Sequence, residues 1–243
     1  MDYQAFKALF EENFTQNGLQ DYLTPEIIEK FYALTEIMTE VNQVMNITAI
    51  REIEKIIPLH YADCVKIASY FPEGSSVIDV GCGGGFPTLP LAIVRPDLSI
   101  TAMDSTAKKV QYVQNTADAL GLTNIKTLSA RAEELAQNPE YREKFDCATS
   151  RAVARLCILS ELCLPFVKIG GHMVVMKGAS GQEELDEATE GIQKLGGQVE
   201  LVHNDILITP FEQESRVNLT VRKAMATPSQ YPRSFGRIKK KPL

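Results

Sequence analysis

A glycine-rich loop at residues 81–85 follows directly on an apolar, β-rich run at Ser76–Val80. Glycines in such a loop permit a tight turn and let a ligand approach the backbone at the start of the next helix. Further β-rich runs follow, each separated from the next by a helix-like segment: Ser99–Met103, Ile125–Ser129, Phe145–Thr149 and His172–Met176. Repeated alternation of strand and helix implies right-handed crossovers and a parallel sheet. The sequence therefore predicts an α/β fold with an open, doubly wound, Rossmann-like sheet.

Two more strands are expected near the C-terminus, at Gln198–Ile208 and Arg216–Lys223. Only a short link containing a proline separates them, so we expect an antiparallel hairpin at one edge of the sheet. This brings the expected total to seven strands, most of them parallel.

The first seventy residues are expected to form a helical extension. Apolar side chains recur there at helical spacing in two stripes, which are most simply explained as packing surface: Phe6, Leu9, Phe10 and Phe14, then Ile27, Phe31, Leu34, Met38, Val41 and Met45. Thr24 and Pro25 have the pattern of an N-cap followed by proline at the first helical position. A third amphipathic helix is expected to begin near Pro58.

The net charge of −6 is unevenly distributed along the chain. Residues 1–50 hold eight acids against two lysines, whereas from Arg216 to the end there are eight Lys or Arg and no acid. Such a split marks either a nucleic-acid contact or a solvated basic tail. We therefore divide the chain into a helical extension (1–70), a central α/β domain (71–225) and a basic C-terminal tail (226–243).

Five cysteines without a C-x-x-C pair fit reduced thiols better than a disulfide framework. The three histidines lack the spacing of metal ligands, and no apolar run is long enough to suggest a membrane span. We expect a cytoplasmic protein with no metal and no membrane attachment.

The loop carries the pattern acid-x-Gly-x-Gly-x-Gly, beginning at Asp79. A dinucleotide fingerprint would need a third glycine where Phe86 stands, which disfavours NAD. S-adenosylmethionine has a zwitterionic amino-acid end where a dinucleotide has pyrophosphate, so Asp79 is expected to hold the ammonium. Amides of the loop, at Gly81, Gly83 and Gly85, are expected to meet the carboxylate. The alternative is a purely structural turn.

Asp104 ends the second strand, where an acidic side chain accepts hydrogen bonds from both ribose hydroxyls of an adenosine cofactor. Ala132 and Glu133 follow the third strand, where methyltransferases of this fold read adenine. Each feature has a structural alternative, a surface acid or an ordinary helix start. Because they follow the second and third strands as the glycine-rich loop follows the first, the three features together favour an S-adenosylmethionine site.

Arg151 follows the fourth strand, at the edge of the sheet where open α/β folds bind ligands. From the residues alone it either bridges cofactor and substrate or is an ordinary ion-pairing arginine. The Asn/Asp-Pro-Pro-aromatic motif of amine methylation is absent here. Cys147, Cys157 and Cys163 are expected to be core residues rather than nucleophiles. Lys177 closes the fifth strand at the same edge and is expected to face substrate phosphate.

Taken together, these segments resemble the family of small-subunit ribosomal RNA guanine-N7 methyltransferases G, also called glucose-inhibited division protein B. The resemblance covers nearly the whole chain. The segments that carry it are Asn46–Ile50, His60 with Asp63, Asp79–Pro87, Asp104-Ser105 with Lys108-Lys109, Ala132-Glu133, Ser150–Ala154, Lys177-Gly178, Tyr231–Arg233 and the final Pro242-Leu243. The continuation Thr106-Ala107 departs mildly from the family's leucine-rich pattern, which touches packing and not cofactor binding.

The resemblance implies S-adenosylmethionine as methyl donor, with cofactor contacts at Gly81, Phe86, Ala132, Glu133 and Arg151 and a ribose-binding segment at Asp104-Ser105. It implies methylation of guanine N7 in 16S ribosomal RNA, alone or in the small ribosomal subunit. We expect a monomer, although the sequence does not itself reveal the oligomeric state. Arg151 would then position the reactants, with no general base. The residues expected to hold RNA phosphates are Lys177, Arg222, Arg233, Lys239, Lys240 and Lys241.

Three other functions compete with this interpretation. A small-molecule methyltransferase would need an enclosing lid and no basic tail. A non-catalytic RNA-binding protein would keep the loop as a relic, which the intact set Asp79, Gly81, Asp104 and Glu133 disfavours. An NAD-dependent enzyme is disfavoured by Phe86.

Overall fold

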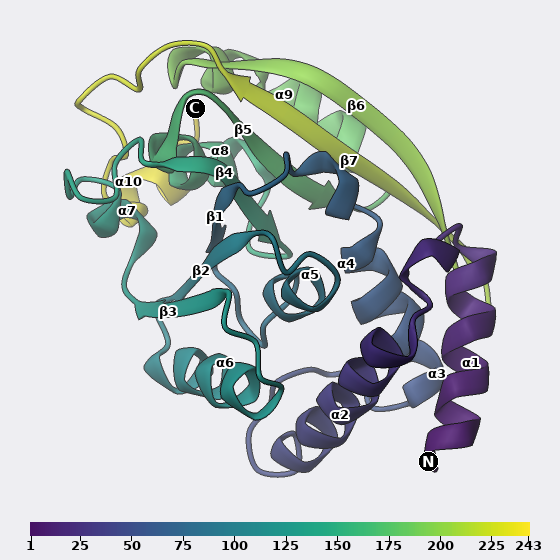
Figure 1. The fold of residues 1–243 in the computed structure, drawn as a ribbon. Helices are drawn as coiled ribbons and strands as arrows, with labels where there is room; N and C mark the ends of the chain where they lie inside the picture. Colours follow the sequence, from purple (N-terminus) through teal and green to yellow (C-terminus); the bar gives the residue numbers. More distant parts are fainter.

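A seven-stranded sheet forms the middle layer of the structure, a computed structural model that describes residues 1–243 (Figure 1). Its strand order is β3-β2-β1-β4-β5-β7-β6. The first five strands run parallel, and β7 lies antiparallel between β5 and β6. The strands are β1 (Ser76–Val80), β2 (Ser99–Asp104), β3 (Ile125–Ser129), β4 (Phe145–Arg151), β5 (Val167–Lys177), β6 (Gly197–Ile208) and β7 (Gln213–Lys223). The expected parallel sheet with an edge hairpin is confirmed.

Helices cover both faces of this sheet (Figure 1). One face packs against the N-terminal helices, α5 and α6, and the other against α7, α8, α9 and α10. The helices are α1 (Tyr3–Gln16), α2 (Pro25–Val41), α3 (Ile53–Ile56), α4 (Asp63–Val65), α5 (Thr88–Val94), α6 (Ala107–Ala119), α7 (Ala132–Leu135), α8 (Leu156–Cys163), α9 (Gly181–Lys194) and α10 (Phe235–Lys240). None of them is both long and apolar enough to cross a membrane.

Alternate residues of each strand enter opposite layers of the core. On β1, Val77 belongs to the apolar cluster on the N-terminal side and Ile78 to the cluster on the α8 side. A sheet buried on both faces explains why its strands read as nearly continuous apolar runs in the sequence. The first cluster also contains Phe6 and Phe31 of the helical extension, so this extension and the sheet share one hydrophobic core.

The first two predicted helices are confirmed, with small shifts of their buried faces. Thr24 caps α2, because its hydroxyl accepts the N–H of Ile27 at 3.3 Å. On α1, Asn13 is buried alongside the phenylalanines, whereas Leu9 is only partly buried. Asn13 takes this position because its amide donates to the carbonyl of Ile208 in the β6–β7 hairpin at 3.2 Å.

The prediction that a third helix begins near Pro58 is wrong. Helical backbone begins at Ile53, and Pro58 lies near the start of a π-helical stretch, Ile57–Ala62, that leads into α4. Proline lacks an N–H, so a helix that passes through it tolerates it best where the regular hydrogen-bond ladder is already interrupted. This stretch delivers His60 and Asp63 to the carboxyl edge of the sheet.

Candidate active site

The glycine-rich loop turns back over the carboxyl ends of β1 and β2. The N–H groups of Gly81 and Cys82 both donate to the carbonyl of Met103, at 2.9 and 2.8 Å. Gly81 has a φ of +79°, and a Cβ there would lie 2.6 Å from Cγ2 of Val153. Only glycine satisfies both conditions, so this loop can lie tightly against the segment after β4.

A cavity of about 580 Å³ opens beside this loop. Eight of the residues that the sequence singled out for the cofactor line it: Gly81, Gly83, Phe86, Asp104, Ser105, Ala132, Glu133 and Arg151. They come from the ends of four neighbouring parallel strands and the turns that follow them. The cavity therefore occupies the ligand-binding position of open α/β sheets.

Asp104 is held firmly at the cavity wall. One carboxylate oxygen accepts the N–H of Gly83 at 3.1 Å and the other accepts the N–H of Thr106 at 2.8 Å. A carboxylate has about four acceptor positions, so two remain for hydroxyl groups of a ligand. Glu133 stands further along the wall, where only 11% of its side chain is exposed and Arg131 lies 3.4 Å away.

Two predicted cofactor residues do not reach the cavity. Asp79 is fully buried beneath the loop, where its Oδ2 accepts the hydroxyl of Thr88 at 2.6 Å and its Oδ1 has no partner. The expectation that Asp79 holds a ligand ammonium by direct contact is therefore corrected. Gly85 faces the core, since a Cβ there would lie 2.5 Å from Leu89. Both residues shape the loop from behind.

The burial of Asp79 makes protein stability depend on pH. Burial raises the pKa of its carboxyl to about 7, and the hydrogen bond from Thr88 opposes this rise. A raised folded-state pKa contributes stability that is complete below about pH 4, the unfolded pKa, and is lost as pH rises through 7. Asp79→Asn should gain stability relative to the original chain as pH rises from about 5 to about 7, by up to about 1.4 kcal/mol per unit.

Urea unfolding of the ligand-free protein at several pH values measures this difference. Asp118→Asn, an exposed substitution on α6, is the matched control and should show no such trend. A stability difference between Asp79→Asn and the original chain that stays constant from about pH 5 to about pH 8 would contradict the assignment.

A second cavity of about 470 Å³ adjoins the first. The two share three lining residues, Arg151, Ala152 and Val153. Ala152 has a φ of +56°, a left-handed conformation that costs free energy for a residue with a Cβ. Strained backbone of this kind concentrates at functional sites, and here it forms the boundary between two ligand-sized spaces.

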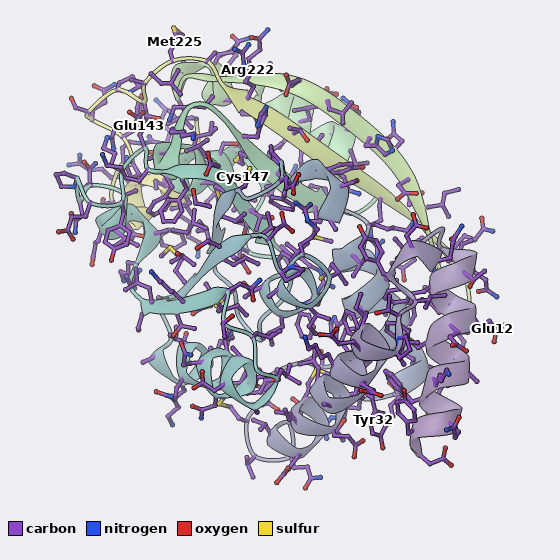
Figure 2. All side chains as sticks on the ribbon, viewed as in Figure 1. Glu12, Tyr32, Glu143, Cys147, Arg222 and Met225 are labelled. Atoms are coloured by element: carbon purple, nitrogen blue, oxygen red, sulfur yellow. The ribbon has the colours of Figure 1, made fainter.

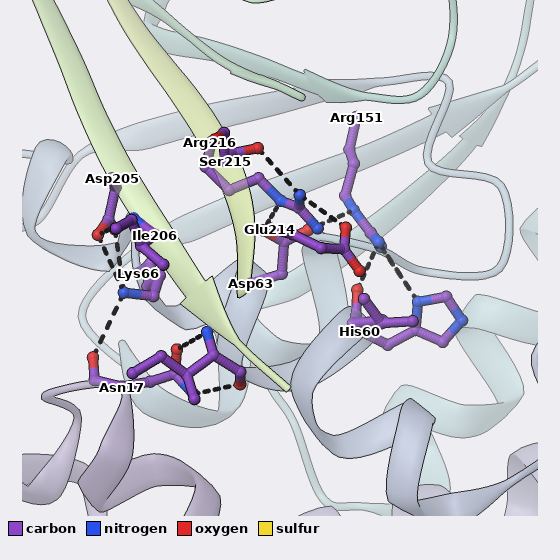
Figure 3. Close-up of polar contacts among 12 residues, drawn as sticks. Asn17, His60, Asp63, Lys66, Arg151, Asp205, Ile206, Glu214, Ser215 and Arg216 are labelled. Carbon is purple, nitrogen blue, oxygen red and sulfur yellow. Dashed lines mark hydrogen bonds and ion pairs between the residues drawn. The ribbon is translucent and has the colours of Figure 1, made fainter. Parts of the chain in front are cut away.

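Arg151 is fixed from the side of the helical extension (Figure 3). Its Nη2 donates to the carbonyl of Leu59 at 2.6 Å, and its Nε lies 3.5 Å from the carboxylate of Asp63. Asp63 in turn accepts Nε of Arg216, from β7, at 2.8 Å. A buried carboxylate between two guanidiniums ties the extension, β4 and β7 together beside the second cavity.

His60 is part of the same network but has no free proton-accepting atom. Its Nε2 lies 2.7 Å from the hydroxyl of Thr48, its Nδ1 faces Arg151 at 3.4 Å, and its ring stacks on Phe86. Burial, with the charge of Arg151 as a second cause, lowers the pKa of His60 to about 3. His60 therefore stays neutral throughout the physiological range.

Of the residues expected to hold RNA phosphates, two form ion pairs within the protein and a third lies away from the cavities. The ammonium of Lys177 is buried, 2.8 Å from Glu184 and 2.7 Å from the carbonyl of Ala154. Arg222 lies near the end of β7, where it pairs in register with His172 in the middle of β5, several residues from the cavities (Figure 2). Arg233 makes a bidentate ion pair with Glu161, whose side chain is fully buried. Lys177 nevertheless lines the second cavity and Arg222 is exposed, so the contacts of these two residues and of Arg233 with RNA stay predictions.

The remaining three predicted RNA-binding residues, Lys239, Lys240 and Lys241, are exposed on α10 and just after it. The C-terminal segment that carries them is ordered and docked on the α8 side of the sheet (Figure 1). Ile238 is fully buried there, and Gln137 donates to the carbonyl of Pro232 at 2.9 Å. This placement holds a basic helix beside the first cavity.

Several residues of the first cavity were not assigned to it from the sequence. Ile47, Lys109 and Val153 stand within segments that carry the family resemblance, so the resemblance was a usable signal for them. Phe235 has no such signal, because nothing in its local pattern distinguishes it from a core or surface aromatic residue. Its position depends on how the C-terminal segment folds back.

Comparisons with known proteins agree with this arrangement. Residues 27–206 match the family model GidB, described as rRNA small subunit methyltransferase G. The chain is similar to ribosomal RNA small subunit methyltransferase G of Lactobacillus delbrueckii subsp. bulgaricus, with 38% identity over 97% of this chain and 98% of that one. The corresponding protein of Clostridium botulinum is 44% identical, over 88% and 90% of the two chains.

Solved structures share the fold at lower sequence identity. A SAM-dependent methyltransferase from Aquifex aeolicus matches 68% of this chain and 92% of its own, with TM-score 0.51 and 20% identity. The cyclase SpnF matches with TM-score 0.54 and 17% identity, over 84% and 97% of the chains. Because a cyclase also has this fold, fold alone does not decide the reaction. The sequence relatives and the family model do decide the family: the chain belongs to the ribosomal RNA small subunit methyltransferase G family.

Proposed function

We propose that this protein transfers a methyl group from S-adenosylmethionine to N7 of a guanine in 16S ribosomal RNA. The observation that carries the proposal is the pair of adjoining cavities, which meet at Arg151, Ala152 and Val153. A transfer reaction needs two ligands whose reacting atoms touch, and the shared wall is where two bound molecules would meet. Membership of the family supports RNA as the acceptor.

The first cavity fits S-adenosylmethionine in its donor set. Asp104 has acceptor positions left for the two ribose hydroxyls, and Glu133 stands where an adenine amine needs an acceptor. Gly83 leaves space for the amino-acid end next to the loop amides, because a Cβ there would meet no atom closer than the carbonyl oxygen of Gly81 at 3.9 Å. When bound, this molecule supplies an electrophilic methyl group on a sulfonium.

The second cavity would receive the target guanine, with N7 directed to the shared wall. The N7 lone pair is free at neutral pH, so no proton has to be removed before attack. The groups around this cavity are poorly suited to remove one, because burial lowers the pKa of His60 to about 3 and ion pairs hold the carboxylates of Asp63 and Glu184. Burial also raises the pKa of Cys64 to about 12 and of Cys147 to about 11, which excludes both as thiolate nucleophiles. We therefore attribute the acceleration of methyl transfer to alignment of the two bound reactants.

Transfer of labelled methyl from S-adenosylmethionine to small ribosomal subunits, bare 16S ribosomal RNA and a mixture of small metabolites, run in parallel, tests the proposal. We expect label in RNA and 7-methylguanosine in its nucleoside digest. The single-turnover rate should be flat between about pH 7 and about pH 9, where an essential base would give a tenfold change per unit below its pKa. Label on an exocyclic amine or a carbon would refute N7, and label only in metabolites would refute RNA.

The exposed lysines of the C-terminal segment should contribute to RNA binding by holding phosphates. Replacing Lys239, Lys240 and Lys241 by alanine should flatten the dependence of the RNA binding constant on salt, by about 0.7–0.9 log units for each phosphate that a lysine neutralises in the original chain. A filter-binding series over salt concentration measures the slope. The matched control replaces three exposed lysines elsewhere, Lys126, Lys144 and Lys194. If both triple variants showed the same salt dependence of RNA binding, the three lysines of the C-terminal segment would not be contacting RNA phosphates.

One chain contains both cavities in full, so we infer that it acts as a monomer. We also infer that it works in the cytoplasm, where ribosomal RNA is modified, and that it needs no metal, since methyl transfer to a free lone pair requires no Lewis acid.

A further inference from the structure

The C-terminal segment brings one large aromatic side chain to the first cavity. Phe235, at the start of α10, lines this cavity, and 37% of its surface is exposed. The other buried or docked residues of the segment, such as Ile238, make contacts that do not involve the cavity. An aromatic ring left facing a ligand-sized space differs from a core residue, because its apolar surface is still available for a partner.

Phe235 approaches the end of the cavity near Ala132 and Glu133, because the stretch before it contacts the segment that follows them. The preceding stretch runs beside α7 and the turn after it, as the hydrogen bonds from Gln137 to Pro232 and from Arg142 to Tyr231 show, at 2.9 and 2.8 Å. Figure 1 likewise places α10 next to α7. Under the proposed function, this is the end of the cavity that receives adenine.

Several contacts hold the segment in place without a ligand. Arg233 binds the buried Glu161 through both its guanidinium and its backbone N–H, and Ile238 is fully buried. Gly191 of α9 lies directly against Leu243, since a Cβ there would come within 2.8 Å of Leu243. The ring of Phe235 is therefore positioned in advance, and a ligand that packs on it has little ordering cost to overcome.

We propose that Phe235 packs against the adenine ring of S-adenosylmethionine and completes the cofactor site from the C-terminal segment. This inference rests on the proposed function, which supplies the ligand. It makes one segment serve both ligands, because the lysines that follow Phe235 are the ones proposed to contact RNA. Base-on-aromatic packing tolerates the partly open geometry of this wall, since every base has a flat π face.

The chain contains no tryptophan, so Phe235→Trp creates a single fluorescent reporter at the cavity. Saturating S-adenosylhomocysteine should change its emission because the adenine would lie against the indole. Phe211→Trp, at the exposed tip of the β6–β7 hairpin, is the matched control and should not respond. Unchanged emission of the Phe235→Trp protein, at a ligand concentration where calorimetry shows full binding, would overturn the inference.

Calorimetry of Phe235→Ala gives an independent measure. We expect the affinity for S-adenosylhomocysteine to fall about tenfold, within the range found when an aromatic partner of a base is removed. Methylthioadenosine, which lacks the amino-acid end, should lose affinity by the same factor, and Phe235→Tyr should restore both. Wild-type affinity in a folded Phe235→Ala protein, or a loss confined to S-adenosylhomocysteine, would overturn the inference. If the original chain binds no S-adenosylhomocysteine at all, the proposed function fails instead.

Discussion

Arg151→Ala should slow single-turnover methyl transfer about a hundredfold, with cofactor and RNA both saturating. Arg151 forms part of the wall common to the two cavities, and contacts with Leu59 and Asp63 hold its guanidinium still. Removing it leaves a gap where the reacting atoms meet, so the reactants lose their alignment. The loss should appear mainly in the transfer rate, and the affinity for S-adenosylhomocysteine should fall by less than about tenfold.

Rapid-quench measurement of labelled methyl transfer gives this rate. The rate of the variant should stay flat between about pH 7 and about pH 9, because loss of the Arg151 charge and of some burial raises the pKa of His60 at most toward its ordinary value of about 6.5, below this range. Arg151→Lys should not restore the rate, since an ammonium cannot bridge Leu59 and Asp63 as a planar guanidinium does. Arg222→Ala, near the end of β7 and away from the cavities, is the matched control and should be as fast as the original when RNA saturates. An Arg151→Ala rate within a few-fold of the original would remove Arg151 from the positioning role.

Arg233→Met should lower the free energy of unfolding by about 3 kcal/mol, the loss typical when one partner of a buried ion pair is removed. Glu161 is fully buried on α8, and both its carboxylate oxygens accept hydrogen bonds from the guanidinium of Arg233. In the variant the guanidinium is gone, and the carboxylate of Glu161 keeps only the backbone N–H of residue 233 as a partner. Urea unfolding followed by circular dichroism measures the change.

A double variant separates the pair from its surroundings. Glu161→Leu combined with Arg233→Leu should be more stable than Arg233→Met, because no uncompensated charge remains in the core. Arg155→Ala, which breaks an exposed pair with Glu187, is the control and should leave the unfolding midpoint almost unchanged. If Arg233→Met were no less stable than Arg155→Ala, the ion pair would not be what docks the C-terminal segment.

The order of the strands and helices could be predicted because it depends on local patterns. The central strands are short apolar runs of the kind expected for a sheet buried on both faces, and their bounds agree within a few residues. The largest difference is β5, which begins at Val167 and not at His172. Lys168, Ile169 and Gly170 are exposed at its start, so no buried-strand pattern marks them. The helix that begins at Ile53 could not be placed correctly from the sequence, because a proline such as Pro58 usually marks the first turn of a helix.

Most of the residues that line the candidate cofactor cavity could also be predicted from the sequence. Residues at the carboxyl ends of neighbouring parallel strands must converge, so Gly81, Asp104 and Glu133 could be brought together from strand order alone. The direction of a side chain relative to its loop is not contained in that order. Asp79 could therefore be assigned to the loop but not to its buried underside, where Thr88 of α5 meets it.

By itself the sequence determined the fold class, the parallel sheet with its edge hairpin, the family and most of the cofactor cavity, because these depend on periodicity and on motifs a few residues long. Only the tertiary structure decided the state of the charged residues. Lys177 and Arg233 look like free cations in the sequence, but each meets a carboxylate on a helix, Glu184 of α9 and Glu161 of α8. The long-range contact between Arg233 and Glu161 also docks the segment that places Phe235 at the cavity. Contacts between residues far apart in the chain follow from how whole layers pack, and no local pattern encodes them.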